Sequence, residues 1–276
     1  PSEIINTIVE HSVTIAIMVP PMYNLLARKG EPSVMETVHD FISGGASIPQ
    51  PVAKAFYDRF GRPVREGYGL TEASPVVSVL PENKPKYLTS GPAVPGVEAM
   101  ILTENGGPYV PGTVGELLVR GDNVMKGYWN KPEETKKVFT EDGWLRTGDL
   151  GKLDEKGNLY IRGRSKTMIL SSSGQNIFPE EIEARLNNLP FVLESLVIER
   201  NKKLVALVYA DYEALDSLGL NQEENLKTIM NENLKNLNSS VASYEKVSQI
   251  QLYPTEFEKT PKRSIKRYLY NSIAED

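Results

Sequence analysis

The sequence predicts an α/β fold that continues into an antiparallel β region and then into a small α+β domain. Three observations support this. Strand-like and helix-like stretches alternate over the first ninety residues, glycine turns separate short strands from about Ser90, and a helix, a hairpin and a helix follow Lys166. We expect residues 1–165 to be part of a large domain, with 1–90 α/β and 91–165 barrel-like, and residues 166–276 to form a small mobile domain.

The α/β part is predicted from β-branched runs and proline-initiated helices. A β-branched run at 13–19 is followed by a helix through Arg28, and a second strand at 38–42 leads into SGGA, residues 43–46. The helix at 51–60 ends at Gly61, and a third strand leads into EGYGLTE, residues 66–72. Strand–helix–strand crossovers make parallel sheets, whose carboxyl edges bind ligands. SGGA and EGYGLTE are therefore expected to face one crevice.

The rest of the chain is predicted from turns and hydrophobic periodicity. The segments VEAMIL, GELLVRG and LDEKGNLYIRG are short strands with glycine at their ends or turns, as in antiparallel, barrel-like sheets. In the last domain, residues 179–188 place Ile182 and Leu186 on one helix face. Residues 195–210 predict a hairpin that turns at Asn201 and Lys202, and residues 223–237 predict a second helix.

Composition excludes several classes of function. The 31 basic and 36 acidic residues give a net charge of −5, so no basic excess points to nucleic acid as a partner. The absence of cysteine excludes disulfides and thiolate chemistry and suits a cytoplasmic protein. No transmembrane segment or signal peptide is expected, because the longest apolar run, at 13–22, contains two prolines. The chain begins with proline rather than methionine, and we expect it to be a piece of a longer protein.

The heptad EGYGLTE carries groups that suit a nucleotide. Tyr68 offers a flat ring for a base, Thr71 a donor for a phosphate oxygen, and Glu72 a carboxylate for Mg²⁺. Gly44 and Gly45 let the backbone approach a ligand closely. Taken alone, each stretch is also compatible with a tight turn, and Tyr68 with a buried core tyrosine.

Two further residues extend this hypothesis. Asp149 in GWLRTGDLG, placed on a short loop, offers acceptors to two vicinal hydroxyls, although an aspartate in a turn more often caps backbone amides. Arg164 in YIRGRSK suits ribose or phosphate, or is an exposed arginine at a domain boundary. His11 and His39 lie in strand-like stretches without metal-ligand spacing, and Trp129 and Trp144 are expected to be packing anchors.

Five motifs occur in an order and at separations that resemble those of the adenylate-forming enzymes. They are SGGA, EGYGLTE, GWLRTGDLG, LYIRGRSK and SGQNIFPEEIE. The enzymes of this family are acyl-CoA synthetases, peptide-synthetase adenylation domains and beetle luciferases. The resemblance implies that a carboxylate attacks the α-phosphate of ATP to give acyl-AMP, which CoA then converts to a thioester. ATP or AMP, Mg²⁺ and coenzyme A are the implied cofactors. The motifs look most like those of medium- to long-chain fatty acyl-CoA ligases, which also allows peripheral association with a membrane.

The resemblance also implies a role for individual residues. Tyr68 would stack on adenine, Thr71 would bind the α-phosphate, Glu72 would hold Mg²⁺, and Asp149 would bind the ribose hydroxyls. Lys166 matches the hinge of the small domain. The remaining implied nucleotide, acyl or CoA contacts are Gly44, Gly45, Ala46, Glu66, Gly67, Gly69, Arg164 and Gly174.

The sequence departs from the family pattern in two respects. The glycine-rich phosphate loop and one wall of the acyl pocket lie upstream of this chain, so we expect the chain alone to have negligible ligase activity. Near the carboxyl end, EKTPKRSIKRYL places Ser264 where the family has a catalytic lysine. We expect Lys266, or its rival Lys262, to supply the charge, the alternative being a solvated basic tail.

Three alternatives stay open at this point. One is an acyl-AMP ligase that loads a carrier protein, and another is a noncatalytic nucleotide sensor that has lost the lysine at Ser264. A structural scaffold fits least, since Thr71, Glu72, Asp149 and Arg164 occur together. The acyl chain length and the oligomeric state are left undetermined.

Overall fold

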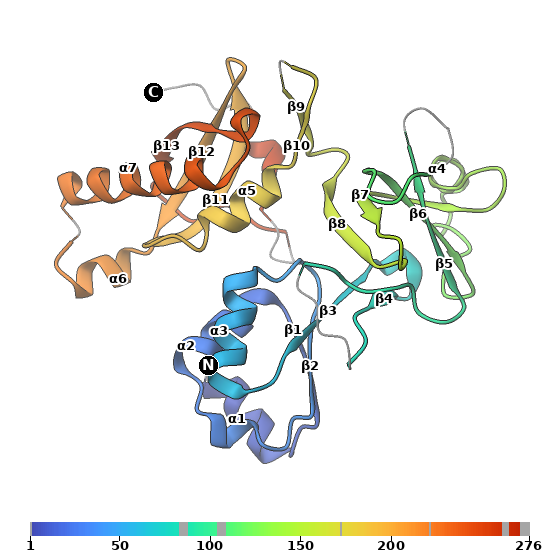
Figure 1. Cartoon of the computed structure of the whole chain (residues 1–276), viewed down its shortest axis with the longest axis horizontal. Helices are drawn as coiled ribbons and strands as arrows, with labels where there is room; N and C mark the ends of the chain where they lie inside the picture. The colour runs from blue at the N-terminus through green and yellow to red at the C-terminus, as the bar shows by residue number, and fades with distance from the viewer. Residues whose placement is uncertain are drawn as a thin grey trace. The chain divides into compact units, whose positions relative to one another are not determined.

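The computed structural model describes residues 2–82, 88–103, 109–171, 173–220, 222–260 and 265–270. The chain divides into two compact units, Pro1–Ser165 and Lys166–Asp276. Each unit has its own sheets and its own core, so each is described by itself (Figure 1).

The first unit begins with a four-stranded sheet in the order β1-β2-β3-β4. Strands β1, β2 and β3 are parallel, as the sequence predicts, and β4 is an unexpected antiparallel addition to β3. The elements are α1 (Ser2–Glu10), β1 (Ile15–Met18), α2 (Pro20–Lys29), η1 (Pro32–Met35), β2 (Asp40–Ser43), α3 (Gln50–Phe60), β3 (Val64–Gly69), η2 (Thr71–Ala73) and β4 (Val76–Val79).

Helices α2 and α3 cover one face of this sheet (Figure 1). Phe56 of α3 packs edge-on against Tyr23 and Phe41, with ring centroids 5.2 and 4.9 Å apart. Helix α3 ends at Gly61, as predicted, because that residue adopts the left-handed conformation (φ 66°) that glycine tolerates. On β1, Ile15 and Ile17 face away from this core and are exposed, which follows from the alternation of side chains along a strand.

The first unit continues with a second sheet, antiparallel and in the order β5-β6-β7-β8. The elements are β5 (Val97–Leu102), β6 (Gly115–Gly121), α4 (Pro132–Val138), β7 (Leu145–Leu153) and β8 (Leu159–Arg164). Among the described residues this sheet is open, with β5 and β8 at its edges, rather than closed into a barrel. Its core side chains, including Leu117 and Leu159, share a cluster with Ala73 of η2 and Val77 of β4.

The second unit is built on a three-stranded sheet in the order β11-β12-β13. The predicted hairpin is confirmed, and Asn201 and Lys202 both have positive φ angles (49° and 61°), as a two-residue turn requires. Strand β13 was not predicted, and it runs parallel to β12. The elements are β9 (Ile169–Leu170), β10 (Asn176–Ile177), α5 (Pro179–Leu186), β11 (Val192–Arg200), β12 (Lys203–Ala210), α6 (Tyr212–Ser217), α7 (Glu223–Ser240), η3 (Ser243–Glu245), β13 (Val247–Leu252) and η4 (Arg267–Leu269).

Both faces of the β11-β12-β13 sheet are covered. Helices α5 and α7 pack on one face, with Ile182, Leu186 and Met230 in the core. The other face, which includes Leu196 and Leu207, packs against aromatic residues near the carboxyl end of the chain. This second layer was not predicted, because the aromatic residues are widely spaced in the sequence.

Several local predictions are corrected by the structure. Asp149 lies within strand β7 rather than on a short loop. His11 lies in the turn after α1, and His39 directly precedes β2, so neither is within a strand. Trp144 is buried as expected, but Trp129 is 89% exposed and does not anchor a core.

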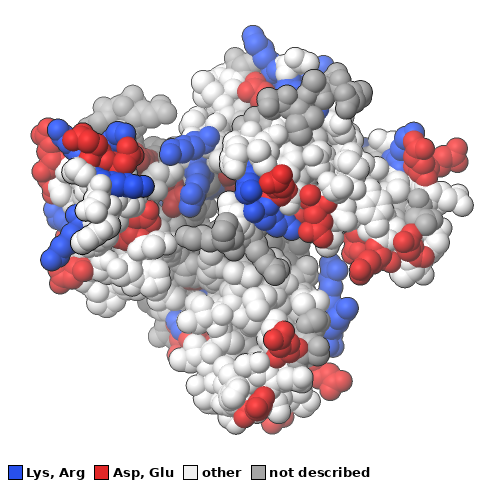
Figure 2. Space-filling view, turned by 180° about the vertical axis from the view of Figure 1, so that it is seen from behind, with Lys and Arg blue, Asp and Glu red and all other residues white. Residues whose placement is uncertain are grey.

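The surface drawn in Figure 2 has lysine and arginine side chains interspersed with aspartate and glutamate. Within the residues that the structure describes, no helix combines the length and the apolar character needed to cross a bilayer.

Candidate nucleotide and acyl-transfer sites

Two glycine-containing stretches lie side by side in the first unit. Ser43, the last residue of β2, is paired with Glu66 of the parallel strand β3. The SGGA and EGYGLTE stretches therefore leave the same edge of the sheet, where the carboxyl ends of parallel strands meet. Gly44 is held in place because its amide donates a hydrogen bond of 3.1 Å to the carbonyl of Met18 in β1.

The glycines of these two stretches differ in whether the local structure requires glycine. A Cβ on Gly69 would lie 1.9 Å from the carbonyl oxygen of Pro75, so only glycine fits there. Gly45 has a φ angle of 82°, in the region that disfavours other residues. At Gly44 and Gly67 the nearest atoms would be 3.9 and 3.6 Å from a Cβ, so packing within this chain does not require glycine.

The turn that carries Thr71 and Glu72 is fixed from several directions. The amide of Leu70 donates to the carbonyl of Pro75 at 2.8 Å, which closes the turn between β3 and β4. Asn123, which follows β6, donates to the carbonyls of Ala73 and Val76, both at 2.8 Å. The turn therefore has a defined backbone conformation.

Glu72 is held through both its backbone and its side chain. Its carbonyl accepts a hydrogen bond of 2.8 Å from the amide of Met125. Its Oε1 accepts one of 2.9 Å from the hydroxyl of Tyr128. Tyr128 is itself positioned by α4, since its amide donates to the hydroxyl of Thr135 at 2.9 Å. The orientation of the Glu72 carboxylate is thus set before any ligand binds.

Tyr68 and Asp149 meet although 81 residues separate them. The hydroxyl of Tyr68 donates to Oδ2 of Asp149 at 2.6 Å. The Nε of Arg164 lies 3.3 Å from Oδ1 of the same carboxylate. Burial, and next the charge of Asp149, raise the pKa of Tyr68, so the phenol stays protonated and acts as a donor. The structure therefore brings three of the predicted nucleotide contacts into one cluster.

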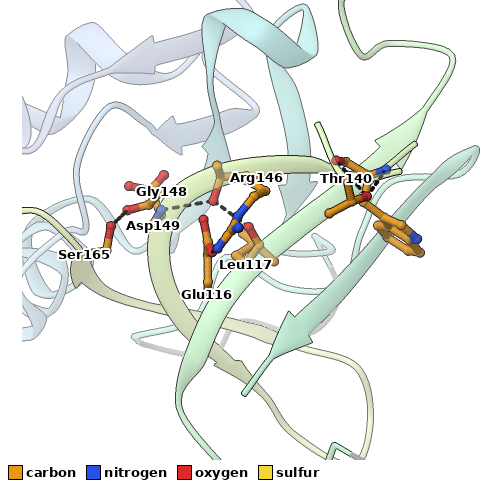
Figure 3. A network of polar contacts seen from close by, with 9 residues as sticks. Glu116, Leu117, Thr140, Arg146, Gly148, Asp149 and Ser165 are labelled. Carbon is orange, nitrogen blue, oxygen red and sulfur yellow. Dashed lines mark hydrogen bonds and ion pairs between the residues drawn. The ribbon is translucent and has the colours of Figure 1, made fainter. Parts of the chain in front are cut away.

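The backbone around Asp149, in β7, is held by the network of polar contacts drawn in Figure 3. Gly148 has a φ angle of 71°, and its carbonyl accepts hydrogen bonds from the amide and hydroxyl of Ser165 at 2.9 and 3.1 Å. The hydroxyl of Thr147 donates to the carbonyl of Leu117 and accepts from the amide of Asp149 (2.8 and 3.1 Å). These contacts fix the Asp149 backbone relative to β6.

Glu66 is buried next to the SGGA stretch. Its Oε2 accepts a hydrogen bond from the amide of Ile48 at 3.4 Å, and Ser47 also hydrogen-bonds to its side chain. Burial raises the pKa of Glu66, and these two hydrogen bonds oppose that shift. The side chain thus ties the loop after β2 to β3, with Ala46 exposed beside it.

The structure describes some of the predicted residues of the second unit and not others. Lys166, the proposed hinge residue, is exposed at the first position of this unit. Gly174 has a φ angle of 81°, and a Cβ at this position would meet no described heavy atom within 4 Å beyond its chain neighbours, so it lies in an open turn. Lys266 pairs with Glu258, with Nζ and Oε2 3.1 Å apart. Lys262 and Ser264 lie outside the described residues.

The second unit also contains a hollow of about 220 Å³ beside the Gly174 turn. Its lining combines cationic, hydroxyl and apolar groups, and it includes Ser171, Ser173, Lys202, Lys203, Tyr244 and Lys246. Lysines and hydroxyls provide hydrogen-bond donors for phosphate oxygens. This hollow was not predicted, because its lysines come from a hairpin turn and from the start of β13.

Comparison with known proteins identifies the family. Residues 1–129 match the AMP-binding enzyme family, and residues 166–273 match the AMP-binding enzyme C-terminal domain. The chain belongs to the adenylate-forming, AMP-binding enzymes. It is 38% identical over 203 residues to a long-chain-fatty-acid–CoA ligase of Bacillus subtilis, an alignment that covers 71% of this chain and 36% of the ligase. It is 35% identical over 202 residues to a feruloyl-CoA synthase of Amycolatopsis, covering 72% of this chain and 40% of that enzyme.

Solved structures of adenylate-forming enzymes support the same assignment. ATP-bound MatB from Rhodopseudomonas palustris aligns with a TM-score of 0.81 at 28% identity, over 98% of this chain and 52% of MatB. The O-succinylbenzoate CoA synthetase MenE of Bacillus subtilis, in complex with AMP, aligns with a TM-score of 0.78 at 25% identity, over 99% of this chain and 53% of MenE. This adenylate-forming chain therefore spans about half the length of these structures and about 40% of the first curated relatives.

Sequence reasoning missed the residues that support the site. Tyr128 contacts the predicted residue Glu72, and Thr147 contacts the predicted residue Asp149. Asn123 contacts the backbone of the turn that carries Thr71 and Glu72. In the segment GYWNKPEET around Tyr128, the tryptophan is the feature that stands out. No spacing pattern in this segment distinguishes Tyr128, so the sequence offered no signal for its contact with Glu72.

Proposed function

We propose that this chain is part of an ATP-dependent acyl-CoA ligase whose substrate is a medium- to long-chain fatty acid. The observation that carries the proposal is the cluster of Tyr68, Asp149 and Arg164, formed by three strands of one unit, together with the oriented carboxylate of Glu72. In the proposed reaction the carboxylate oxygen bonds to the α-phosphorus of ATP and pyrophosphate leaves. The CoA sulfur then attacks the acyl carbon, and the bond to AMP breaks.

Each residue of the first unit has a role in this proposal. The ring of Tyr68 stacks on adenine, while its hydroxyl holds the Asp149 carboxylate toward the ribose hydroxyls. Arg164 adds a cation that is 73% exposed and faces the same carboxylate. Thr71, on the closed turn, donates to the α-phosphate. Catalysis would then consist mostly of positioning and charge neutralisation.

Glu72 suits a magnesium ion that is shared with the nucleotide. Mg²⁺ is often held by one or two carboxylates together with substrate phosphates rather than by an all-protein cage. The described residues contain no group of three or more acidic or histidine side chains that would form such a cage. Glu72 is a partly exposed carboxylate with one oxygen oriented by Tyr128, as this type of site requires. When bound, the ion would neutralise charge on the phosphates.

The second unit would serve thioester formation. We propose that Lys166 is the hinge between half-reactions and that the Gly174 turn leaves room for pantetheine. The hollow beside it carries Lys202, Lys203 and Lys246, which match the phosphate groups of CoA. Among the basic residues near the carboxyl end, Lys266 or Lys262 would supply the cation for adenylate formation.

Support for a fatty acid comes from the relatives. Several long-chain-fatty-acid–CoA ligases match at 34–43% identity. The feruloyl-CoA synthase at 35% identity favours an aromatic acid as the second candidate. A noncatalytic AMP-binding protein and a carrier-loading acyl-AMP ligase are the remaining alternatives.

The test is a substrate panel on the full-length protein. It would be incubated with ATP, Mg²⁺, CoA and octanoate, palmitate, ferulate or malonate, while pyrophosphate and thioester are measured separately. We expect pyrophosphate and thioester with the fatty acids. Pyrophosphate without thioester would indicate carrier loading, thioester only with ferulate would indicate the aromatic candidate, and AMP binding without pyrophosphate release would refute the ligase proposal. The 276-residue chain by itself is expected to give negligible thioester.

A further inference from the structure

Two parts of the C-terminal segment, residues 258–270, are described, 258–260 and 265–270, and backbone contacts join them. Lys259 and Ile265 form an antiparallel bridge, and the amide of Lys266 donates to the carbonyl of Glu258 at 2.8 Å. The described ends of the basic stretch EKTPKRSIKR are therefore adjacent. Residues 261–264, between them, lie outside the described residues.

An aromatic cluster attaches this segment to the sheet of the second unit. Tyr270 is only 4% exposed, and its ring packs edge-on against Tyr253 and Phe257, with centroids 5.4 and 5.2 Å away. Its hydroxyl accepts a hydrogen bond of 2.7 Å from the amide of Glu258. This attachment does not involve Arg267, so the segment should remain packed against the sheet when Arg267 is replaced.

Arg267 connects the segment to two other elements around the edge of the sheet. Its guanidinium pairs with Glu183 of α5 through NH2, and NH1 donates to the carbonyl of Val197 in β11 at 3.3 Å. The other oxygen of Glu183 accepts a hydrogen bond of 2.6 Å from the amide of Val197. Since β11 is an edge strand, Glu183 and Arg267 together satisfy backbone groups that would otherwise lack a strand partner.

The contacts of Arg267 fix the orientation of its guanidinium plane as well as attaching the segment to the sheet. The Nε of Arg267 also lies 3.6 Å from Oε1 of Glu180, so the planar guanidinium faces two carboxylates and a carbonyl. A guanidinium has a fixed fork of donors, whereas an ammonium is a point charge that sets no plane. Lys259 and Lys266 pair with Glu194 and Glu258. The Lys266 pair lies within the segment, whereas Lys259 and Arg267 attach the segment to β11 and α5, which argues against a solvated tail.

We propose that Arg267 is a positioning residue for adenylate formation, because its contacts with α5 and β11 fix the orientation of the neighbouring Lys266 in the described part of the C-terminal segment. The inference rests on the proposed ligase function. In that function a cation from this stretch neutralises charge at the reacting carboxylate and α-phosphate, and a displacement of about 1 Å is enough to slow such a step strongly. In the proposed function this cation acts only in the first step, so the two half-reactions should respond differently.

The experiment measures both half-reactions in the full-length protein. Arg267→Met should slow carboxylate-dependent pyrophosphate release by about 10- to 100-fold. Conversion of a chemically prepared acyl-AMP to thioester by CoA should change by less than about twofold, since the proposed role lies in the first step. Arg267→Lys, which keeps the charge but not the fork, should fall between Arg267→Met and the parent protein. Trypsin should cut after Lys266 faster in Arg267→Met than in the parent protein, as read by mass spectrometry.

The matched control is Arg185→Met. Arg185, on α5, also donates to a backbone carbonyl of the second unit, that of Ser240 at 2.6 Å, but it does not contact the C-terminal segment in the described structure. It should leave both half-reactions unchanged. Equal slowing of both half-reactions by Arg267→Met, or no slowing of either, would overturn the positioning role while the ligase function stands. Absence of pyrophosphate release from the parent protein with every acid would instead refute the proposed function, and this inference with it.

Discussion

Replacing Glu183 with glutamine should change how the stability of the second unit depends on pH. Glu183 is buried, with 8% of its surface exposed, and it faces Arg267, Glu180 and the amide of Val197. Burial raises the pKa of Glu183 from an ordinary 4.5 to about 7, although Arg267 and the Val197 amide act in the opposite direction. The folded unit therefore holds this proton more tightly than the unfolded chain does.

The size and sign of the effect follow from linkage. Below pH 4.5 both states carry the proton, and the contribution of Glu183 to stability is fully present. Above that pH the unfolded chain loses the proton first, so this contribution declines as the pH rises through the folded value of about 7. The gap between the two pKa values corresponds to about 3 kcal/mol, at about 1.4 kcal/mol for each pH unit. Relative to Glu183→Gln, the parent protein should thus lose about 3 kcal/mol between pH 4 and pH 8.

Native-state hydrogen exchange is the suitable assay, because the chain has two units and a single unfolding transition cannot be assumed. Amides in β11 and β12 report on the second unit, after correction for the intrinsic exchange rate at each pH. Glu232→Gln, at an exposed position of α7, controls for the general cost of removing a carboxylate. A difference between parent and Glu183→Gln that stays constant over this pH range, or that grows in favour of the parent, would refute the reasoning.

Three further substitutions test the site in the first unit. Tyr68→Phe removes the 2.6 Å hydrogen bond to Asp149 and should lower the unfolding free energy of the first unit by about 1.5–3 kcal/mol, measured by native-state hydrogen exchange. Gly69→Ala forces a methyl group against the Pro75 carbonyl and should cost about 1–3 kcal/mol in the same assay. Tyr128→Phe frees the proposed metal ligand Glu72 and should weaken Mn²⁺ binding by about 1 kcal/mol, roughly fivefold, measured by electron paramagnetic resonance of the nucleotide complex.

Gly69→Ala and Tyr128→Phe each have a control in the same unit. Gly44→Ala adds a methyl group where the nearest atom is 3.9 Å away, so it should be close to neutral in unfolding. Tyr160→Phe removes a tyrosine–carboxylate hydrogen bond of 3.3 Å to Asp154, remote in sequence from Glu72, and should leave Mn²⁺ affinity unchanged. A loss of Mn²⁺ affinity of the same size in Tyr160→Phe and Tyr128→Phe would show that the effect is general to the fold.

Local sequence signals were sufficient where the structure is decided by neighbouring residues. The parallel strands before SGGA and EGYGLTE were predicted from β-branched runs, and the turn at Asn201 and Lys202 from its flanking apolar strands. The adjacency of SGGA and EGYGLTE followed from the general geometry of parallel sheets. Strands β4 and β13 were missed, because their pairing depends on partners brought close only by the fold.

The sequence by itself determined the family, the order of the sheets along the chain and the chemical groups available to a nucleotide, since these depend on residue type and spacing. Only the tertiary structure decided that Tyr68 meets Asp149 across 81 residues, that Tyr128 orients Glu72, and that Arg267 pairs with a buried Glu183. These contacts join segments from different strands and helices. Their energies depend on burial and on distances of a few ångströms, which no local pattern of residues specifies.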